Sequence, residues 1–235
     1  MVGLSASTAS LAAFAAPLQW TVDPLVFVAV AFGVFLLAAI VAPLVLLSVR
    51  ETREPTADER DRLAAMAAAA DYDPKSVHVV ETVGEHSIEV SIRGPPGRRS
   101  LLVTDYVLSD LDSQTASALL AAEAGRSRLL YMEYRAVAAA SIIGIATGMF
   151  GGLVSFSDGL FVLAIAALAL LWGGRQLQFS ADSLAAGHVG AETLATAFET
   201  VATLKGVEPE ESTWHTWFEV QPPLGQRIGR LRDRS

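Results

Sequence analysis

The hydrophobic pattern of the chain is dominated by long runs without charged side chains. Residues 25–49 contain no Lys, Arg, Asp or Glu, and about 20 apolar residues suffice for a helix to cross the hydrocarbon core of a bilayer. Residues 136–156 form a second such run, and residues 160–172 return after a turn predicted at 157–159. The pattern predicts three transmembrane helices, the last two forming a hairpin over 136–172. The alternative, a buried helical hairpin of a soluble protein, is disfavoured by the lack of charge in both limbs.

The polar stretch between the first two apolar runs predicts a small folded unit. An amphipathic helix is expected over 59–70, where apolar side chains recur on one face. Alternating β-branched residues predict strands over 76–83 and 86–93, joined at Gly84, and a third strand over 100–104. These strands are expected to form a small antiparallel sheet.

Helices are predicted on both sides of the apolar hairpin. A helical run from Leu119 to Arg135 leads into it. Two further helices follow it, separated near 187–190, and the second has a clear apolar face. After Pro222 and Pro223 a last amphipathic helix is expected to dock on the rest of the unit.

The predicted fold class is an α+β membrane protein, in which three transmembrane helices carry a mainly helical cytoplasmic domain with a small antiparallel sheet. Arginines flank the apolar runs on one side only, at Arg50, Arg135 and Arg175. Because basic flanks stay in the cytoplasm, a multi-pass protein of the cell membrane is expected, with its N-terminus outside and its domain and C-terminus cytoplasmic. The predicted division is a lead-in at 1–24, a transmembrane helix at 25–49, a first cytoplasmic part at 50–135, the transmembrane hairpin at 136–172 and a second cytoplasmic part at 173–235.

Composition narrows the chemistry. The chain has 235 residues, a formal net charge of -8 and no cysteine, so disulfides and thiolate metal sites are excluded. Only two lysines occur, Lys75 and Lys205, and no basic face predicts a nucleic-acid partner. An acidic, lysine-poor composition is also typical of proteins from high-salt hosts.

Several segments, in order along the chain, resemble the HtpX-like membrane zinc metallopeptidases, the H-E-x-x-H family that includes the CaaX-prenyl-protease type. LLAAEAGR, at 119–126, matches the zinc-helix pattern LLAHELGH. A two-span hairpin follows, then RQLQFSADSLAA, which matches R-x-x-E-F-x-A-D, and finally QPPLGQRIGRL, which matches H-P-P-L-x-x-R-I-x-x-L. With the first apolar run, these segments cover most of the chain.

The resemblance implies that Ala122, Arg126 and Gln178 stand at the three zinc-ligand positions. Alanine has no donor atom, arginine is permanently cationic, and glutamine offers only a neutral amide oxygen. Glu123 keeps the general-base position, where it has little to deprotonate without a metal-bound water. The sequence therefore predicts a degenerate family member without a metal or other cofactor.

The family pattern also implies roles for residues around the ligand positions. Arg175, Asp182 and Arg227 keep their places and are expected to lie behind the ligand positions. Arg126 is expected to project into the former metal cavity, within reach of Asp182, or else to pair with Glu123 on its own helix.

The leading hypothesis for function is a catalytically inactive pseudopeptidase that acts as a binding or regulatory module in membrane-protein quality control. Its partners would be the lipid bilayer and either membrane or unfolded polypeptides or an active paralogue. In active relatives an edge strand before the zinc helix binds extended substrate, and the matching residues here are His86, Ile88 and Val90.

Two alternatives stay open. An active zinc metalloendopeptidase would need a displaced site, built for instance from His188 or His215 with Glu123 or Glu133. A structural membrane subunit would have no peptide site.

Overall fold

A computed structural model describes residues 23–49, 52–82, 87–206 and 222–234. Residues 1–22 of the lead-in predicted at 1–24 lie outside the described residues, as do His86 and His215. The elements in chain order are α1 Pro24–Val49, β1 Thr52–Arg53, α2 Ala57–Ala69, β2 Ser76–Val80, β3 Val90–Arg93, β4 Ser100–Thr104, α3 Asp105–Ser109, α4 Ser113–Arg128, α5 Tyr131–Phe150, α6 Phe156–Val189, α7 Ala191–Leu204 and α8 Leu224–Arg232.

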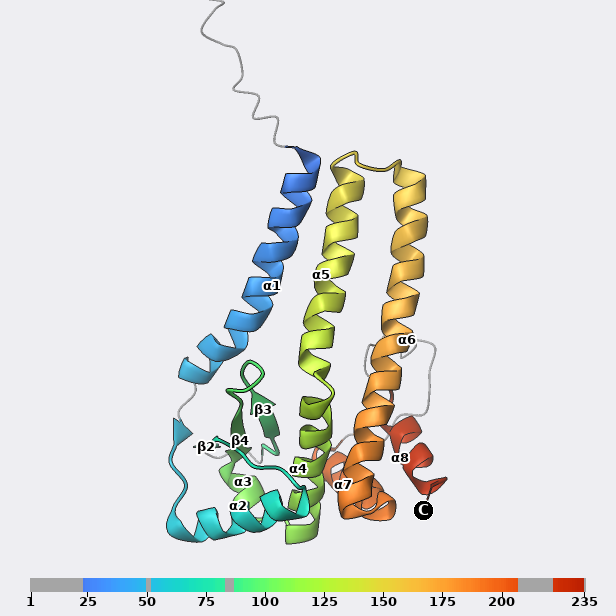
Figure 1. Cartoon of the computed structure of the whole chain (residues 1–235). Coiled ribbons are helices and arrows are strands. Elements are labelled where there is room, and N and C mark those ends of the chain that lie inside the picture. The colour runs from blue at the N-terminus through green and yellow to red at the C-terminus, as the bar shows by residue number, and fades with distance from the viewer. Residues whose placement is uncertain (1–22, 50–51, 83–86, 207–221, 235) are drawn as a thin grey trace, which may run out of the picture.

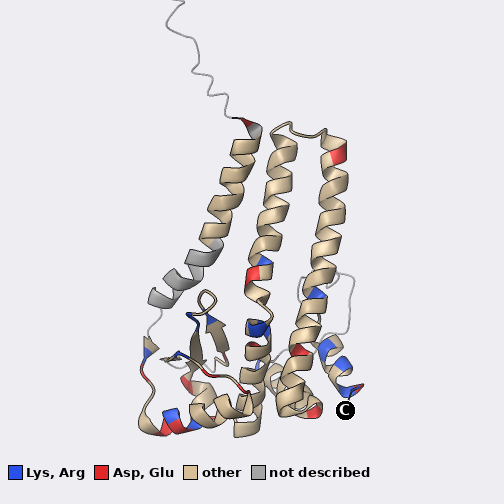
Figure 2. Cartoon of the chain, viewed as in Figure 1, with Lys and Arg blue, Asp and Glu red and all other residues tan. Residues whose placement is uncertain are grey.

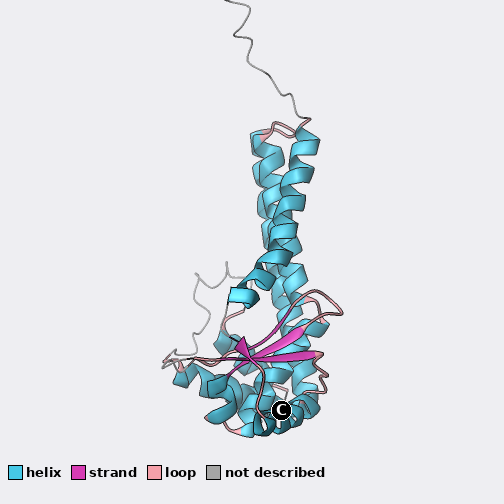
Figure 3. Ribbon diagram, turned by 90° about the vertical axis from the view of Figure 1, so that its left-hand side faces the viewer, coloured by secondary structure: helices cyan, strands magenta, loops and turns pink. Residues whose placement is uncertain are grey.

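Three long helices form a narrow stalk above a broader folded part. α5 stands between α1 and α6 and contacts both, while the sheet and the shorter helices lie at the lower end (Figures 1 and 3). Charged residues gather in the lower part, and the upper lengths of the stalk are almost free of them (Figure 2). The stalk and the lower part thus have the contrasting compositions expected of a membrane region and a water-exposed region.

α6 is long and apolar enough to cross a membrane. Within its most apolar window of 18 residues only 6% are buried, whereas the core helix of a soluble protein would be mostly buried. α4 and α5 would count as a second span only if taken together across a bend of 51°. The described apolar part of α1, Leu25–Ala38, is shorter than a full span.

The turn of the hairpin differs from its predicted position. α5 ends at Phe150, and α6 begins at Phe156, where the Ser155 hydroxyl accepts a hydrogen bond from the Asp158 amide. The turn predicted at 157–159 is therefore wrong, because this cap places Asp158 in the first turn of α6. α6 then continues without a break to Val189, so the division predicted at 172 falls inside one helix.

The sheet is mixed, with strand order β1-β2-β4-β3. β2 pairs with β4 in parallel, whereas β3 pairs with β4 and β1 pairs with β2 in antiparallel fashion. The predictions of an antiparallel sheet and of a hairpin joining the strands on either side of Gly84 are therefore wrong. The tight turn lies instead between β3 and β4, where Gly94 and Gly97 adopt positive φ angles that favour glycine.

The helical run predicted from Leu119 to Arg135 is broken. α4 ends at Arg128, and Leu130 adopts a left-handed conformation with φ 54° before α5 begins. Below the break α4 packs closely on α6, because Gly125 has no side chain. A Cβ atom at Gly125 would lie 2.4 Å from the carbonyl oxygen of Ala181.

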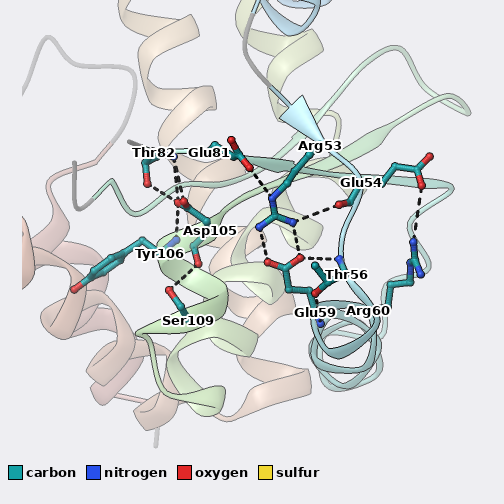
Figure 4. A network of polar contacts seen from close by, with 10 residues as sticks. All are labelled: Arg53, Glu54, Thr56, Glu59, Arg60, Glu81, Thr82, Asp105, Tyr106 and Ser109. Atoms are coloured by element: carbon teal, nitrogen blue, oxygen red, sulfur yellow. Dashed lines mark hydrogen bonds and ion pairs between the residues drawn. The ribbon is translucent and has the colours of Figure 1, made fainter. Parts of the chain in front are cut away.

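A polar network ties the segment after α1 to the folded part (Figure 4). Arg53 in β1 donates two hydrogen bonds of 2.6 and 2.7 Å to Glu59 near the start of α2, and a third of 2.9 Å to Glu81 after β2. These bonds hold the pKa of Glu59 down, at about 2. Thr56 and Glu59 also form a reciprocal capping box, which fixes where α2 begins.

Candidate functional site

α4 carries the first part of the site. Asp112 caps the helix by accepting a hydrogen bond from the Thr115 amide at 2.8 Å, and the buried face of α4 packs on α6, α7 and the sheet. Ala122 is buried on this face. Glu123 and Arg126 form an ion pair of 3.0 Å within the helix, with side chains 19% and 24% exposed. The Arg126 Nε atom is buried and has no hydrogen-bond partner in the described part of the chain.

α6 and α8 carry the second part. Asp182 accepts two hydrogen bonds of 2.8 Å from Arg227, one from Nε and one from Nη2, and both side chains are buried. Gln178, one turn before Asp182 and fully buried, donates from Nε2 to Asp182 at 3.0 Å. The Arg227 guanidinium also lies 4.3 Å from the ring centroid of Phe198 in α7. The aspartate therefore joins α6 to α8 through a dry, bidentate contact.

The expected contact between Arg126 and Asp182 is wrong. Arg227 already satisfies both carboxylate oxygens of Asp182, whereas Arg126 pairs with Glu123, the simpler arrangement. Arg175 also lies on α6 and is partly buried. The helices that carry the predicted ligand positions, α4 and α6, thus take part in two separate ion pairs, Glu123–Arg126 and Asp182–Arg227.

The side chains at the ligand positions do not fit a catalytic zinc. Ala122 offers no donor, and Arg126 brings a positive charge. Gln178 presents its amide nitrogen to Asp182, which leaves only its neutral oxygen. This oxygen is buried and has no hydrogen-bond partner among the residues described. A catalytic zinc needs about three donors from His, Asp, Glu or Cys. Within the described ranges no group of three such side chains converges.

The residues proposed for a displaced site do not come together in the described part of the chain. His188 is exposed near the end of α6, where its Nε2 atom lies 2.8 Å from Nη1 of Arg128. Glu133 is bound by Arg99 at 2.5 Å. Both candidate ligands therefore face guanidinium groups.

Two adjoining pockets lie between β3 and the helices. The strand pocket, of about 230 Å³, is lined by residues 88–91 at the start of β3, by α4, by Val201 of α7 and by Lys205, which follows α7. The arginine pocket, of about 240 Å³, lies between the β3–β4 turn, the end of α4 and the start of α5. Both are lined by Arg93, Glu123 and Arg126. The Glu123–Arg126 pair therefore marks the point where the pockets meet.

β3 presents an open edge at these pockets. It is the last strand in the order of the described sheet, so only its β4 side is paired. The Thr104 amide donates to the Glu89 carbonyl, and hydrogen-bonded pairs alternate along an antiparallel ladder. Because Glu89 is hydrogen-bonded to β4, its neighbour Val90 is not, and neither is Ile92 two residues further on. The amide and carbonyl groups of Val90 and Ile92 therefore point away from β4. Ile88 and Val90 of the predicted peptide-binding strand line the strand pocket, with little of their side chains exposed.

Tyr131 is a site residue that the motif did not reveal. It begins α5, is 2% exposed, and lines the arginine pocket, and its hydroxyl has no hydrogen-bond partner among the described residues. The only sequence signal for Tyr131 is an aromatic residue just before an apolar run.

Comparison with known proteins supports the fold. No protein-family model and no curated protein matches the sequence. Among solved structures, the crystal structure of S. mikatae Ste24p is similar to this chain, with a TM-score of 0.64 and 14% sequence identity. The match covers 88% of this chain and 56% of Ste24p, so the chain spans little more than half the length of that protein. The likeness therefore concerns the fold of this chain.

Proposed function

We propose that this protein is a membrane-anchored pseudopeptidase that binds extended segments of unfolded or membrane polypeptides beside β3 without cleaving them. The observation that carries the proposal is the open edge of β3 beside the strand pocket, directly opposite the helix that carries Ala122 and Arg126. An open strand edge offers main-chain hydrogen bonds to an added strand, and the pocket offers room for its side chains. Peptide binding needs neither a metal nor a base.

Loss of hydrolysis follows from the same side chains. Glu123, the residue at the general-base position, is engaged by Arg126 at 3.0 Å. An arginine keeps its charge at every physiological pH, so it stabilises the carboxylate and leaves no site for a dication beside it. Retained polypeptide would then be protected from cleavage or handed to an active paralogue.

The membrane arrangement that accompanies this function has α1, α5 and α6 as three spans, with the N-terminus outside and the lower part cytoplasmic. The exposed apolar side chains of all three helices support it. Cysteines replacing Ser157 and Ser109 one at a time should separate the two sides, since the chain has no native cysteine. In intact cells an impermeant thiol reagent should label Ser157→Cys only, and labelling of Ser109→Cys would reject this orientation.

Site-specific photocrosslinking tests the peptide proposal. A photoreactive amino acid at Glu89, which lines the strand pocket, should capture β-casein, a disordered polypeptide, when the full chain is held in a neutral detergent. The same group at Ser109, exposed on α3, serves as the background. Equal capture at both positions would reject peptide binding in this pocket.

A pocket-filling variant sharpens the test. Val201→Trp should fill the strand pocket from α7 and lower capture at position 89 about tenfold, a loss of roughly 1.4 kcal/mol in binding. Thr203→Trp, on the exposed side of the same helix, is the matched control and should leave capture unchanged. Capture that persists in Val201→Trp would move the binding surface away from this pocket. A structural subunit without a peptide site predicts no capture in any variant.

A further inference from the structure

The arginine pocket concentrates positive charge in an acidic protein. Four arginines line it, against two glutamates, although the whole chain has a net charge of -8. The lining arginines come from three places, namely the β3–β4 hairpin with Arg93 and Arg99, the last turn of α4 with Arg126, and the start of α5 with Arg135. Cations from separate elements around one cavity favour a bound anion.

Much of the hydrogen-bonding capacity in this pocket is unused. Arg135 is exposed to solvent and has no carboxylate or hydrogen-bond partner among the residues that the structure describes. The Nε atom of Arg126 and the hydroxyl of Tyr131 are buried and have none either. Arg99 is held by Glu133 at 2.5 Å and by Ser127, so it is fixed in place with its charge offset. Buried donors are normally satisfied, so unpartnered ones around a cavity suggest a missing acceptor.

The position of the pocket indicates where that acceptor comes from. The pocket lies at the foot of the stalk, where α5 passes from Glu133 and Arg135 into an uncharged run that starts at Ala136. Its remaining walls are partly apolar, with Pro95, Pro96 and Met132 among them. A cavity with guanidinium groups beside apolar walls, next to helices with exposed apolar faces, matches the junction between a lipid head group and its chains.

We propose that the arginine pocket binds the phosphate group of an anionic membrane phospholipid. Arg126 and Arg135 would donate to the phosphate oxygens, with the Tyr131 hydroxyl as a further donor, because guanidinium groups suit phosphate geometry. The apolar walls would contact the glycerol end of the lipid chains. The inference rests on the membrane anchoring proposed above and is independent of peptide binding in the strand pocket.

Thermal unfolding of the detergent-solubilised full chain tests this site. Short-chain phosphatidylglycerol should raise the midpoint by at least about 3 °C at saturation, because a ligand that binds only the folded state stabilises it. Phosphatidylcholine of the same chain length and sodium phosphate at equal concentration should raise it by less than about a third of that shift. An equal shift with phosphatidylcholine would show binding of lipid chains only, and an equal shift with phosphate would show a soluble anion site. Either result would overturn the proposal.

Matched variants locate the effect. Arg135→Gln removes a pocket arginine that has no ion pair to lose and should abolish most of the phosphatidylglycerol shift. Arg98→Gln removes the same charge from the neighbouring turn, outside the pocket lining, and should keep the shift. Each variant is compared with its own lipid-free midpoint, so a change in basal stability does not affect the result.

Equal losses in both variants would mean diffuse attraction and reject the site. A glutamate-rich peptide that shifts the midpoint more than phosphatidylglycerol, with the same dependence on Arg135, would assign the pocket to acidic polypeptides instead. That result would contradict the lipid proposal while leaving the crosslinking test of the strand pocket unaffected.

Discussion

The two ion pairs near the predicted zinc-ligand positions, Asp182–Arg227 and Glu123–Arg126, differ in burial and in the helices that they connect. Asp182 and Arg227 have side chains 4% and 5% exposed and join two helices. Arg227 donates two hydrogen bonds to Asp182. Glu123 and Arg126 lie on one helix, share a single contact and line both pockets. The pair on α6 is thus a buried contact between two helices, whereas the pair on α4 is partly exposed beside two pockets.

The largest effect is expected from breaking the buried pair. Arg227→Ala should leave Asp182 as a buried, uncompensated charge and lower the free energy of unfolding by about 3 to 5 kcal/mol. Denaturation of the detergent-solubilised protein would measure it. The double variant Asp182→Leu with Arg227→Met removes both charges and should recover part of the loss. A stability change below about 1 kcal/mol in Arg227→Ala would show that this contact is not structural.

The next largest loss of stability is expected from disturbing the close packing of α4 on α6 at Gly125. Gly125→Ala would place a Cβ atom 2.4 Å from the Ala181 carbonyl oxygen and force α4 away from α6. We expect a loss of about 1 to 3 kcal/mol in the same denaturation measurement. Gly187→Ala, also in a helix but with no atom within 4 Å of the added Cβ, is the control. It should be neutral or stabilising, because alanine favours the helix. Similar behaviour of the two variants would refute the close contact.

A third ion pair, Arg53 with Glu59, provides an intermediate case, since it is bidentate but only partly buried. The pKa of Glu59 is lowered from 4.5 to about 2, so the carboxylate stabilises the fold above pH 4.5. This stabilisation is lost as the pH falls from 4.5 towards 2. Arg53→Gln should make the melting temperature less sensitive to pH across that window, by the equivalent of about 1 kcal/mol. Arg60→Gln, whose pair with Glu54 is exposed at 3.8 Å, should keep the parent pH profile. Identical profiles for the two variants would contradict this assignment.

The smallest change in stability is expected from breaking the Glu123–Arg126 pair, which lines both pockets. Arg126→Ala removes one partly exposed contact of 3.0 Å on a single helix and should change the free energy of unfolding by less than about 0.5 kcal/mol. Arg128→Ala, which breaks a surface pair with Asp71, is the comparison. A loss in Arg126→Ala as large as that in Arg227→Ala would mean that both ion pairs are structural, and the contrast between them would disappear.

The sequence predicted the chemistry of single positions better than their partners. Residue identities at 122, 126 and 178 predict that zinc ligands are missing, and this stays a prediction. The partner of Asp182 was not predictable from helix spacing, because Arg227 lies 45 residues further along the chain and reaches it only through the packing of α8 on α6. The family pattern had placed Arg227 near the site but assigned it no contact.

Local pattern also failed where tertiary packing decides. The break between α4 and α5 at Leu129 and Leu130 contains no glycine or proline from which it could be predicted. The arginine pocket lies at this break, between the end of α4 and the start of α5. The order of the strands could likewise not be predicted, because the alternation of apolar and polar residues shows which face of a strand is buried and not which strands are its neighbours. Apolar runs, in contrast, predicted that helices occupy 25–49 and most of 136–172, because uncharged composition is a property of the segment alone. They did not predict that the last helix continues to Val189.

Zinc content, measured by mass spectrometry on the purified and dialysed full chain, tests most directly whether the metal centre has been lost. We expect well below one zinc per chain in the parent. The triple variant Ala122→His, Arg126→His and Gln178→Glu should bind about one zinc, because it restores three donors beside Glu123 on a fold that is otherwise retained. One zinc per parent chain that resists dialysis, accompanied by cleavage of β-casein, would contradict the loss of the metal centre and identify an active peptidase.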